Sequence, residues 1–152
     1  MSKRILTALF VLFVVTLTMS AQYSSEQENR GVPAYNKLPP AKGTKLPPIL
    51  KKDALWGENG GPAQIRAYEL AAKIPTVLHQ LPCFCYCDRG MGHKSLRTCF
   101  EGTHGAQCDV CMKELFYAYG EKQKGKTVAQ IRKGIIDGQW KNVTQEQAEA
   151  LN

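Results

Sequence analysis

All six cysteines of this 152-residue chain lie within residues 81–112, together with two of its three histidines. That stretch reads LPCFCYCDRGMGHKSLRTCFEGTHGAQCDVCM. Its thiol and imidazole side chains are Cys83, Cys85, Cys87, His93, Cys99, His104, Cys108 and Cys111. Zinc prefers thiolate and imidazole ligands, and Cu(I) prefers soft thiolates. The sequence therefore predicts that this segment ligates a metal or carries out thiol chemistry.

The first three cysteines alternate with Phe84 and Tyr86 in a C-x-C-x-C pattern. In an extended segment alternate side chains point to the same side, so three sulfurs would face one point. A disulfide between residues two apart departs from the Cα separation of an ordinary structural bridge. The loop therefore suits a thiophilic ion, or a strained and easily reduced disulfide.

The last two cysteines form a C-x-x-C motif, Cys108 to Cys111, at the start of a predicted helix. Free amides and the helix dipole favour thiolate over thiol there. Residues three apart share a helix face, so both sulfurs could meet one ion or each other. If the pair is redox-active, we expect Cys108 to be the nucleophile, Cys111 its partner, and the C-x-C-x-C loop the resolving segment.

Taken in chain order, the donors form two sets of three cysteines and one histidine. The first set is Cys83, Cys85, Cys87 and His93, and the second is Cys99, His104, Cys108 and Cys111. This composition occurs in closed tetrahedral zinc sites, and Cu(I) would accept two or three of the same sulfurs. Two separate sites and one shared thiolate cluster both agree with the sequence. His93 and His104 suit either ligation or hydrogen bonding within their loops, whereas His79 is expected to be a partly buried or surface imidazole.

The elements that must position these donors are predicted to be helices. Pro62 suits the first turn of a helix over residues 62–73, and Pro75 would end that helix and begin a second over 75–80. Apolar residues at helical spacing predict a helix over 109–124. Capping signatures at Thr127 and Thr144 predict two more. No segment alternates as a strand would, so we expect an all-α, cysteine-rich domain over 62–141 and a short C-terminal helix or tail over 142–152.

The first residues predict export. Lys3 and Arg4 precede an apolar run over 5–17, and Ala21 offers a small residue for cleavage, an order typical of a secretory signal over 1–21. The run is short for a bilayer-spanning helix, which needs about 20 apolar residues. We therefore expect a periplasmic or extracellular protein cleaved near Ala21. An uncleaved N-terminus would instead keep the protein peripherally associated with a membrane.

Residues 22–61 are expected to form a proline-rich tether without fixed structure. They hold five of the eight prolines and repeat KLPP at 37–40 and 45–48. Proline disfavours helix and sheet and favours extended conformations. Four apolar residues are expected to dock the end of the tether onto the domain: Ile49, Leu50, Leu55 and Trp56.

Three functions agree with these patterns. The first is binding of Cu(I) or Zn(II), and the second is thiol–disulfide exchange with a thiol-bearing partner protein. The third is an interaction module stapled by three disulfides, because exported cysteines usually pair and a domain of about 80 residues often needs cross-links. The net charge of +7 is spread along the chain, so nucleic acid is not an expected partner. No Gly-rich phosphate loop indicates a nucleotide cofactor.

Several stretches resemble the bacterial proteins named for a PCYCGC or CYCXC motif, some of them described as selenoproteins. The matching stretches are residues 71–81 (AAKIPTVLHQL), 82–87 (PCFCYC), 92–96 (GHKSL), 99–100, 104–105, 108–111 (CDVC) and 125–132 (GKTVAQIR). Phe84 replaces the motif's tyrosine and Tyr86 replaces its glycine, so we expect no tight turn at Tyr86. The resemblance implies export. Occasional selenocysteine in relatives implies that at least one sulfur reacts or binds a soft metal.

Overall fold

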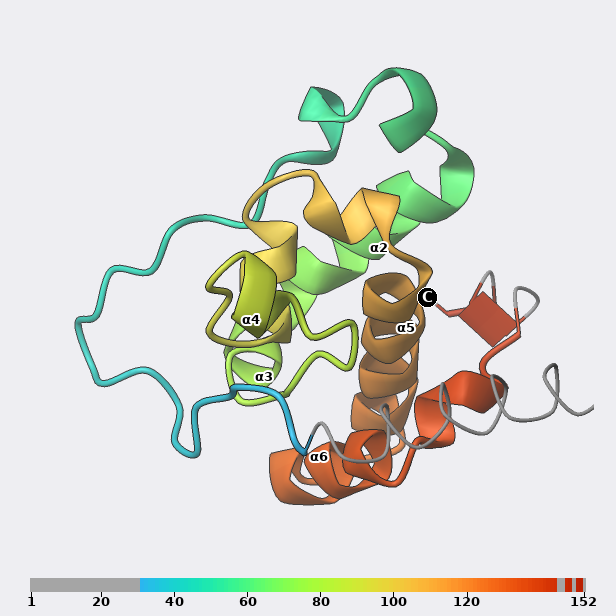
Figure 1. Cartoon of the computed structure of the whole chain (residues 1–152). Helices are drawn as coiled ribbons and strands as arrows, with labels where there is room; N and C mark the ends of the chain where they lie inside the picture. Colours follow the sequence, from blue (N-terminus) through green and yellow to red (C-terminus); the bar gives the residue numbers. More distant parts are fainter. Residues whose placement is uncertain (1–30, 145–146, 149, 152) are drawn as a thin grey trace, which may run out of the picture. The chain divides into compact units, whose positions relative to one another are not determined.

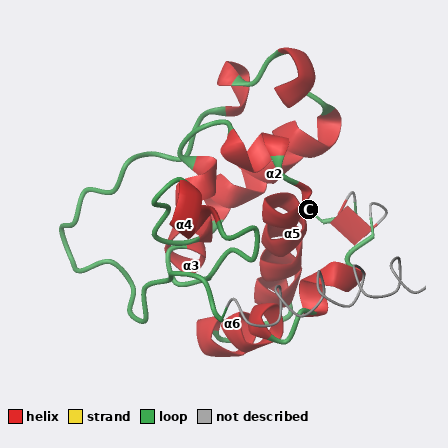
Figure 2. Ribbon diagram, in the orientation of Figure 1, coloured by secondary structure: helices red, strands yellow, loops and turns green. Residues whose placement is uncertain are grey.

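A computed structural model describes residues 31–144, 147–148 and 150–151 (Figure 1). The predicted signal over 1–21 and the first part of the predicted tether lie outside these residues. The described part is helical and contains no strand (Figure 2), which confirms the predicted all-α class. None of its helices has the length and apolar character needed to cross a bilayer.

The longest α-helices in this part of the chain are α2 (Pro62–Lys73) and α5 (Asp109–Gln123). The shorter ones are α3 (Pro75–Leu78), α4 (Cys87–Gly90) and α6 (Val128–Ile136). Turns of 3-10 helix lie between them: η1 (Lys52–Ala54), η2 (Gly57–Asn59), η3 (Leu96–Phe100), η4 (His104–Gln107) and η5 (Gln139–Asn142). The segment between α3 and α5 is therefore built from single turns, and it carries most of the cysteines.

Helix α5 stands at the centre of residues 32–152 and contacts α2, α6, η4 and η5 (Figure 1). Its Leu115 and Ala118 are fully buried. On α2, Leu70 and Ala71 are also fully buried. This helix begins at Pro62 and ends at Lys73, two residues before Pro75, as the prolines predict. Helices α2 and α5 thus pack through fully buried side chains, and the C-x-x-C motif lies at the start of α5.

The described part of the predicted tether contacts the domain near both of its ends, and the segment between them is mostly exposed. The amide of Ala34 donates to Asp88 Oδ2 at 3.0 Å, and the side-chain amide of Asn36 donates to the carbonyl of His79 at 3.0 Å. Near its other end, the amide of Leu50 donates to the carbonyl of Phe100 at 2.8 Å. Residues 33–36, which we call the strap, thus contact the segment that carries the cysteines.

Four apolar residues were expected to dock the end of the tether. Leu55 is buried, and Ile49 and Leu50 pack on the core from partly buried positions. The prediction is wrong for Trp56, whose ring is 81% exposed. It stands between η1 and η2, and neither of these single turns contains a buried residue on which the ring could pack.

Thr127 caps α6 as its sequence predicts. The Thr127 hydroxyl accepts from the amide of Gln130 at 3.3 Å, and Gln130 Oε1 accepts from the amide of Thr127 at 2.9 Å. Of the last predicted helix, only part is described, but Thr144 and Gln147 exchange the same pair of hydrogen bonds.

We expect Thr127→Ala to lower the free energy of unfolding by about 1 kcal/mol, because it leaves an amide at the start of α6 without its acceptor. Thr127→Ser keeps the hydroxyl and is the matched control, expected close to the parent. Denaturant unfolding of the reduced protein, followed by helical circular dichroism, measures both variants. An alanine variant as stable as the serine variant would show that the cap contributes nothing.

Candidate metal centre

The structure brings all eight sequence-predicted donors together. The C-x-C-x-C loop leaves α3 and runs into α4, so that Cys87 is the first residue of α4. His93 follows α4, Cys99 lies in η3, and His104 begins η4. Cys108 is the N-cap of α5 and Cys111 lies in its first turn. All six cysteines are free thiols, four of them buried and Cys85 and Cys108 partly exposed.

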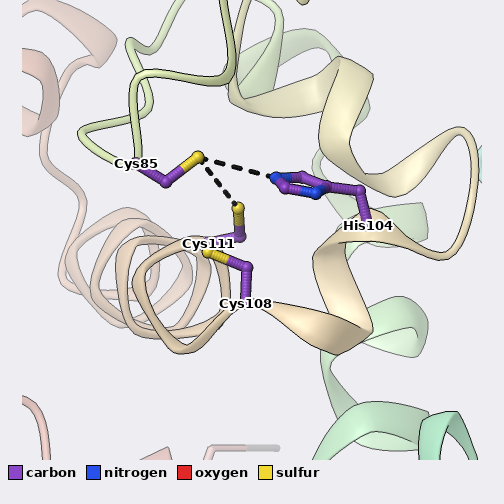
Figure 3. A group of neighbouring side chains, drawn as sticks. All are labelled: Cys85, His104, Cys108 and Cys111. Carbon is purple, nitrogen blue, oxygen red and sulfur yellow. Dashed lines mark hydrogen bonds between the residues drawn. The ribbon is translucent and has the colours of Figure 1, made fainter. Parts of the chain in front are cut away.

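One donor set is Cys85, His104, Cys108 and Cys111, shown in Figure 3. Their ligand atoms all lie within 4.8 Å of one another. Cys85 Sγ is 3.6 Å from His104 Nε2 and 3.8 Å from Cys111 Sγ. The loop after α3, the start of η4 and the first turn of α5 each supply a part of this set.

A second compact set is Cys87, His93, Cys99 and His104, again within 4.8 Å of one another. Cys87 and Cys99 place their sulfurs 3.4 Å apart, and His93 Nδ1 is 3.3 Å from Cys99 Sγ. The two histidine rings meet edge to face with centroids 5.1 Å apart. His104 is thus within reach of both sets.

Cys83 links the two sets. Its sulfur is 3.4 Å from that of Cys85 and 3.4 Å from that of Cys111. It also lies within 4.8 Å of the sulfurs of Cys87 and Cys99. The eight donors therefore form one connected group that could hold a metal ion, which we call the thiol cluster.

The compact sets differ from those taken in chain order. The chain-order sets placed Cys85 with His93, and Cys99 with His104 and the C-x-x-C motif. In the structure Cys85 faces Cys108 and Cys111, whereas Cys99 faces Cys87 and His93. The C-x-C-x-C loop brings its three sulfurs within 4.8 Å of one another, but it turns at its end and so presents them to different neighbours.

The turn is at Tyr86, where the sequence predicted none. Tyr86 adopts the left-handed conformation with φ 58° and ψ 29°, and its amide donates to the carbonyl of Cys83 at 3.1 Å. The ring packs edge to face on Phe84 at 5.9 Å and lies under the guanidinium of Arg89 at 4.5 Å. The expectation was wrong because these contacts offset the strain of a bulky residue in this conformation, at a position where the family motif has glycine.

Glu114, on α5, holds the C-x-C-x-C loop through a hydrogen bond, a role that the sequence analysis did not predict. Its side chain is fully buried, and Oε1 accepts from the amide of Phe84 at 2.8 Å. Burial raises the pKa of this carboxyl well above its usual range. Its spacing is the signal that could have found it, because a residue three after Cys111 shares the helix face of that cysteine.

Tyr68 holds the loop that carries His104. Its buried hydroxyl donates to the carbonyl of Gly102 at 2.6 Å and accepts from the amide of Ala106 at 3.2 Å. Burial raises the pKa of Tyr68 to about 12, so the hydroxyl keeps its proton. These two bonds tie η4 and the residues just before it to α2, and thereby fix the position of His104.

His79 stands apart from the cluster, as predicted. Its ring is partly buried, Nδ1 lies 3.4 Å from the side-chain amide of Asn36, and it belongs to none of the donor groups. Burial, and secondarily Arg97, lowers the pKa of His79. It therefore serves as a neutral contact for the strap.

The thiols shift one another's acidity. Hydrogen bonds from Cys108, Cys111 and Cys83 lower the pKa of Cys85, and hydrogen bonds with Cys111 and Cys83 lower the pKa of Cys99 to about 4. The bond to Cys111 raises the pKa of Cys83. Cys111 lowers the pKa of Cys108, but Cys85 and burial outweigh it and leave that pKa raised. Each compact set thus contains one sulfur whose pKa is lowered by its neighbours, Cys85 or Cys99.

We expect Glu114→Ala to be less stable than Glu114→Gln by about 2 kcal/mol. Glutamine keeps an oxygen that accepts from the Phe84 amide, whereas alanine leaves that amide buried and unpaired. Comparing two uncharged variants removes the effect of the carboxyl group itself. Denaturant unfolding of the reduced, metal-free protein gives both values, and equal stabilities would mean that this hydrogen bond does not hold the loop.

We expect Tyr86→Gly to be more stable than Tyr86→Ala by about 1 kcal/mol. Both variants lose the contacts with Phe84 and Arg89, but only alanine retains the strain of a left-handed backbone. Thermal unfolding of the reduced protein measures the difference. If alanine were equally stable, the turn at residue 86 would not be left-handed in solution.

Comparison with known proteins places the chain in a family. Residues 54–150 match the family described as "Protein of unknown function with PCYCGC motif". No curated protein and no solved structure matches the chain. The matched region covers more than half of the chain and contains every donor of the thiol cluster, including residues 82–87, which carry the motif as PCFCYC. The chain therefore belongs to the PCYCGC-motif family.

Proposed function

We propose that this protein binds a thiophilic metal ion, Cu(I) or Zn(II), through the thiol cluster. One observation carries the proposal: six free thiols and two imidazoles from separate segments converge with ligand atoms within 4.8 Å of their neighbours. Buried titratable groups at one point repel one another once they ionise. A cation removes that repulsion, and it favours the thiolate forms that ligation requires.

The spacing of the sulfurs suits a tetrahedral ion. A Zn–S bond of about 2.3 Å in tetrahedral geometry separates neighbouring sulfurs by about 3.8 Å. The sulfur contacts of the cluster run from 3.4 Å for Cys83 with Cys85 to 3.8 Å for Cys85 with Cys111. Ligation would thus require small movements only.

The contacts do not single out three disulfides. The sulfur of Cys83 is equally close, at 3.4 Å, to those of Cys85 and Cys111. A bridge from Cys83 to either partner would leave the other without its nearest neighbour. Shared contacts of this kind favour ligation over a stapled scaffold, in which each sulfur has one partner.

A bound ion would also stabilise the fold. The segment from α3 to α5 consists of single turns, and small domains often rely on a metal or disulfides for stability. We further propose that the protein acts outside the cytoplasm, as the pattern over residues 1–21 predicts. There it would bind or carry metal ions in a compartment that favours disulfides, with its thiols protected by ligation.

The test is anaerobic titration of the reduced, metal-free protein with Zn(II) and with Cu(I), in competition with a chromophoric chelator. We expect at least one tightly bound ion per chain. His104→Gln should weaken binding at least about tenfold because it removes a ligand, and His79→Gln, which removes an imidazole outside the cluster, should leave binding unchanged. If both Zn(II) and Cu(I) bind at less than one equivalent per chain, the proposal is contradicted.

Thiol–disulfide exchange is a second candidate, favoured by the acidity of Cys85. Cys85 is partly exposed, its pKa is lowered, and the sulfurs of Cys83 and Cys111 are 3.4 and 3.8 Å away. The sequence predicted Cys108 as the nucleophile. The acidity pattern instead favours Cys85, because a thiolate attacks a partner's disulfide and a neighbouring thiol then releases that partner in reduced form.

A glutathione redox titration of the metal-free protein, read out by thiol alkylation, tests this second function. Exchange activity requires a disulfide that is reduced within the range of the glutathione couple. Bridges that stay intact below about −300 mV would be structural, and that result would exclude the redox function.

A further inference from the structure

We propose that the thiol cluster is a two-ion centre with interleaved ligands. This inference rests on the proposed metal-binding function. One ion takes Cys85, His104, Cys108 and Cys111, and the other takes Cys83, Cys87, His93 and Cys99. The Cys83 thiolate lies between the two ions, where it can bridge them.

The first set follows from the position of Cys108. Among the donor groups, Cys108 belongs to one only, with Cys85, His104 and Cys111. An ion that Cys108 ligates without a large rearrangement of the chain would therefore take its other ligands from these three neighbours. The set has three cysteines and one histidine, a composition of closed zinc sites.

The second set consists of the donors that remain. The sulfurs of Cys83, Cys87 and Cys99 lie pairwise within 4.8 Å, and His93 Nδ1 is 3.3 Å from Cys99 Sγ. This set again has three cysteines and one histidine. His104 is near both sets, but the first set needs its imidazole because no other histidine lies near Cys108.

The number of donors favours two ions over one. A single tetrahedral ion with three cysteines and one histidine would leave three buried sulfurs beside it, those of Cys83, Cys87 and Cys99. Two of these sulfurs, Cys87 and Cys99, lie within 4.8 Å of His93. A second ion would use the same groups as ligands and favour their deprotonated forms.

Cys83 makes the two ions neighbours. Its sulfur is 3.4 Å from Cys85 and from Cys111 of the first set, and within 4.8 Å of Cys87 and Cys99 of its own set. Ligation of Cys83 by the second ion would therefore orient two ligands of the first. We expect the two ions to bind cooperatively for this reason.

The interleaving arises in the C-x-C-x-C loop. Its middle cysteine, Cys85, faces the C-x-x-C motif, while the turn at Tyr86 directs Cys87 toward Cys99. A chain-order arrangement would instead keep Cys85 with Cys83 and Cys87, and Cys99 with Cys108. The two arrangements differ only in the exchange of Cys85 and Cys99.

Two double variants distinguish these arrangements. Cys85→Ser with Cys108→Ser damages one set of the interleaved centre but both sets of the chain-order arrangement. Cys99→Ser with Cys108→Ser does the opposite. Native mass spectrometry of the full chain, reduced and loaded with zinc anaerobically, counts the ions. We expect two zinc ions in the parent, one in the Cys85/Cys108 variant and none in the Cys99/Cys108 variant.

The reverse pattern in the two variants would overturn the interleaved assignment. One zinc ion in the parent would overturn the two-ion centre and leave the metal-binding function intact. No zinc would overturn the two-ion centre, and it would overturn the metal-binding function as well if Cu(I) also fails to bind. Cadmium NMR of the parent protein needs no variant and guards against misfolding of the serine proteins. Two cadmium resonances coupled through a shared thiolate are expected, and a single resonance would contradict the inference.

Discussion

The contact between the first turn of α5 and the C-x-C-x-C loop determines the rest of the site. Glu114, fully buried on α5, accepts the amide of Phe84 at 2.8 Å. One turn earlier on the same helix, Cys111 lies 3.4 Å from Cys83. The loop is thus held by its backbone and by its sulfur against the most buried helix of the domain. Without this contact the three cysteines of the loop would have no fixed relation to the C-x-x-C motif.

The remaining donors lie on short turns that are held in place by contacts with α2. The hydroxyl of Tyr68, on α2, bonds to Gly102 just before η4 and to Ala106 within it. Its ring packs on Phe100 of η3 at 5.1 Å. The same aromatic residue therefore steadies His104 and the turn that carries Cys99. A small helical pair, α2 and α5, is enough to organise a segment that has little regular structure of its own.

The sequence predicted the elements because their determinants are local. Pro62 and Pro75 delimit α2, and the capping pair Thr127 and Gln130 begins α6. It also predicted that the cysteines gather, since so many thiols in one stretch leave little alternative. The sequence could not predict that Cys85 and Cys99 exchange places between the two donor sets, because this exchange depends on how η3 and α5 pack. Chain order says nothing about which neighbour a sulfur faces after a turn.

Tyr86 and Glu114 show the same limit in single residues. A tyrosine is a poor candidate for a left-handed turn on local grounds, and only the contacts with Phe84 and Arg89 reveal why it is tolerated. A glutamate in a helix is ordinarily a surface residue. Its spacing from Cys111 places it on the buried face of α5, but its partner, the amide of Phe84, follows only from the packing of the loop. The partner of Glu114 is 30 residues away in the sequence, whereas the partners of Tyr86 are close in sequence but meet its ring only once the turn has formed.

The strap gives the two sides of the thiol cluster unequal access to solvent. Pro33 is buried, and with Ala34 it lines a narrow gap beside Cys83, Cys87 and His93. On the other side Cys85 and Cys108 remain partly open. Traffic of ions or of a partner's thiol would accordingly pass through the open side. An ion held beneath the strap by Cys83, Cys87 and His93 would dissociate more slowly than one held by Cys85 and Cys108. The exposed side of the cluster would then exchange ions, and the covered side would retain them.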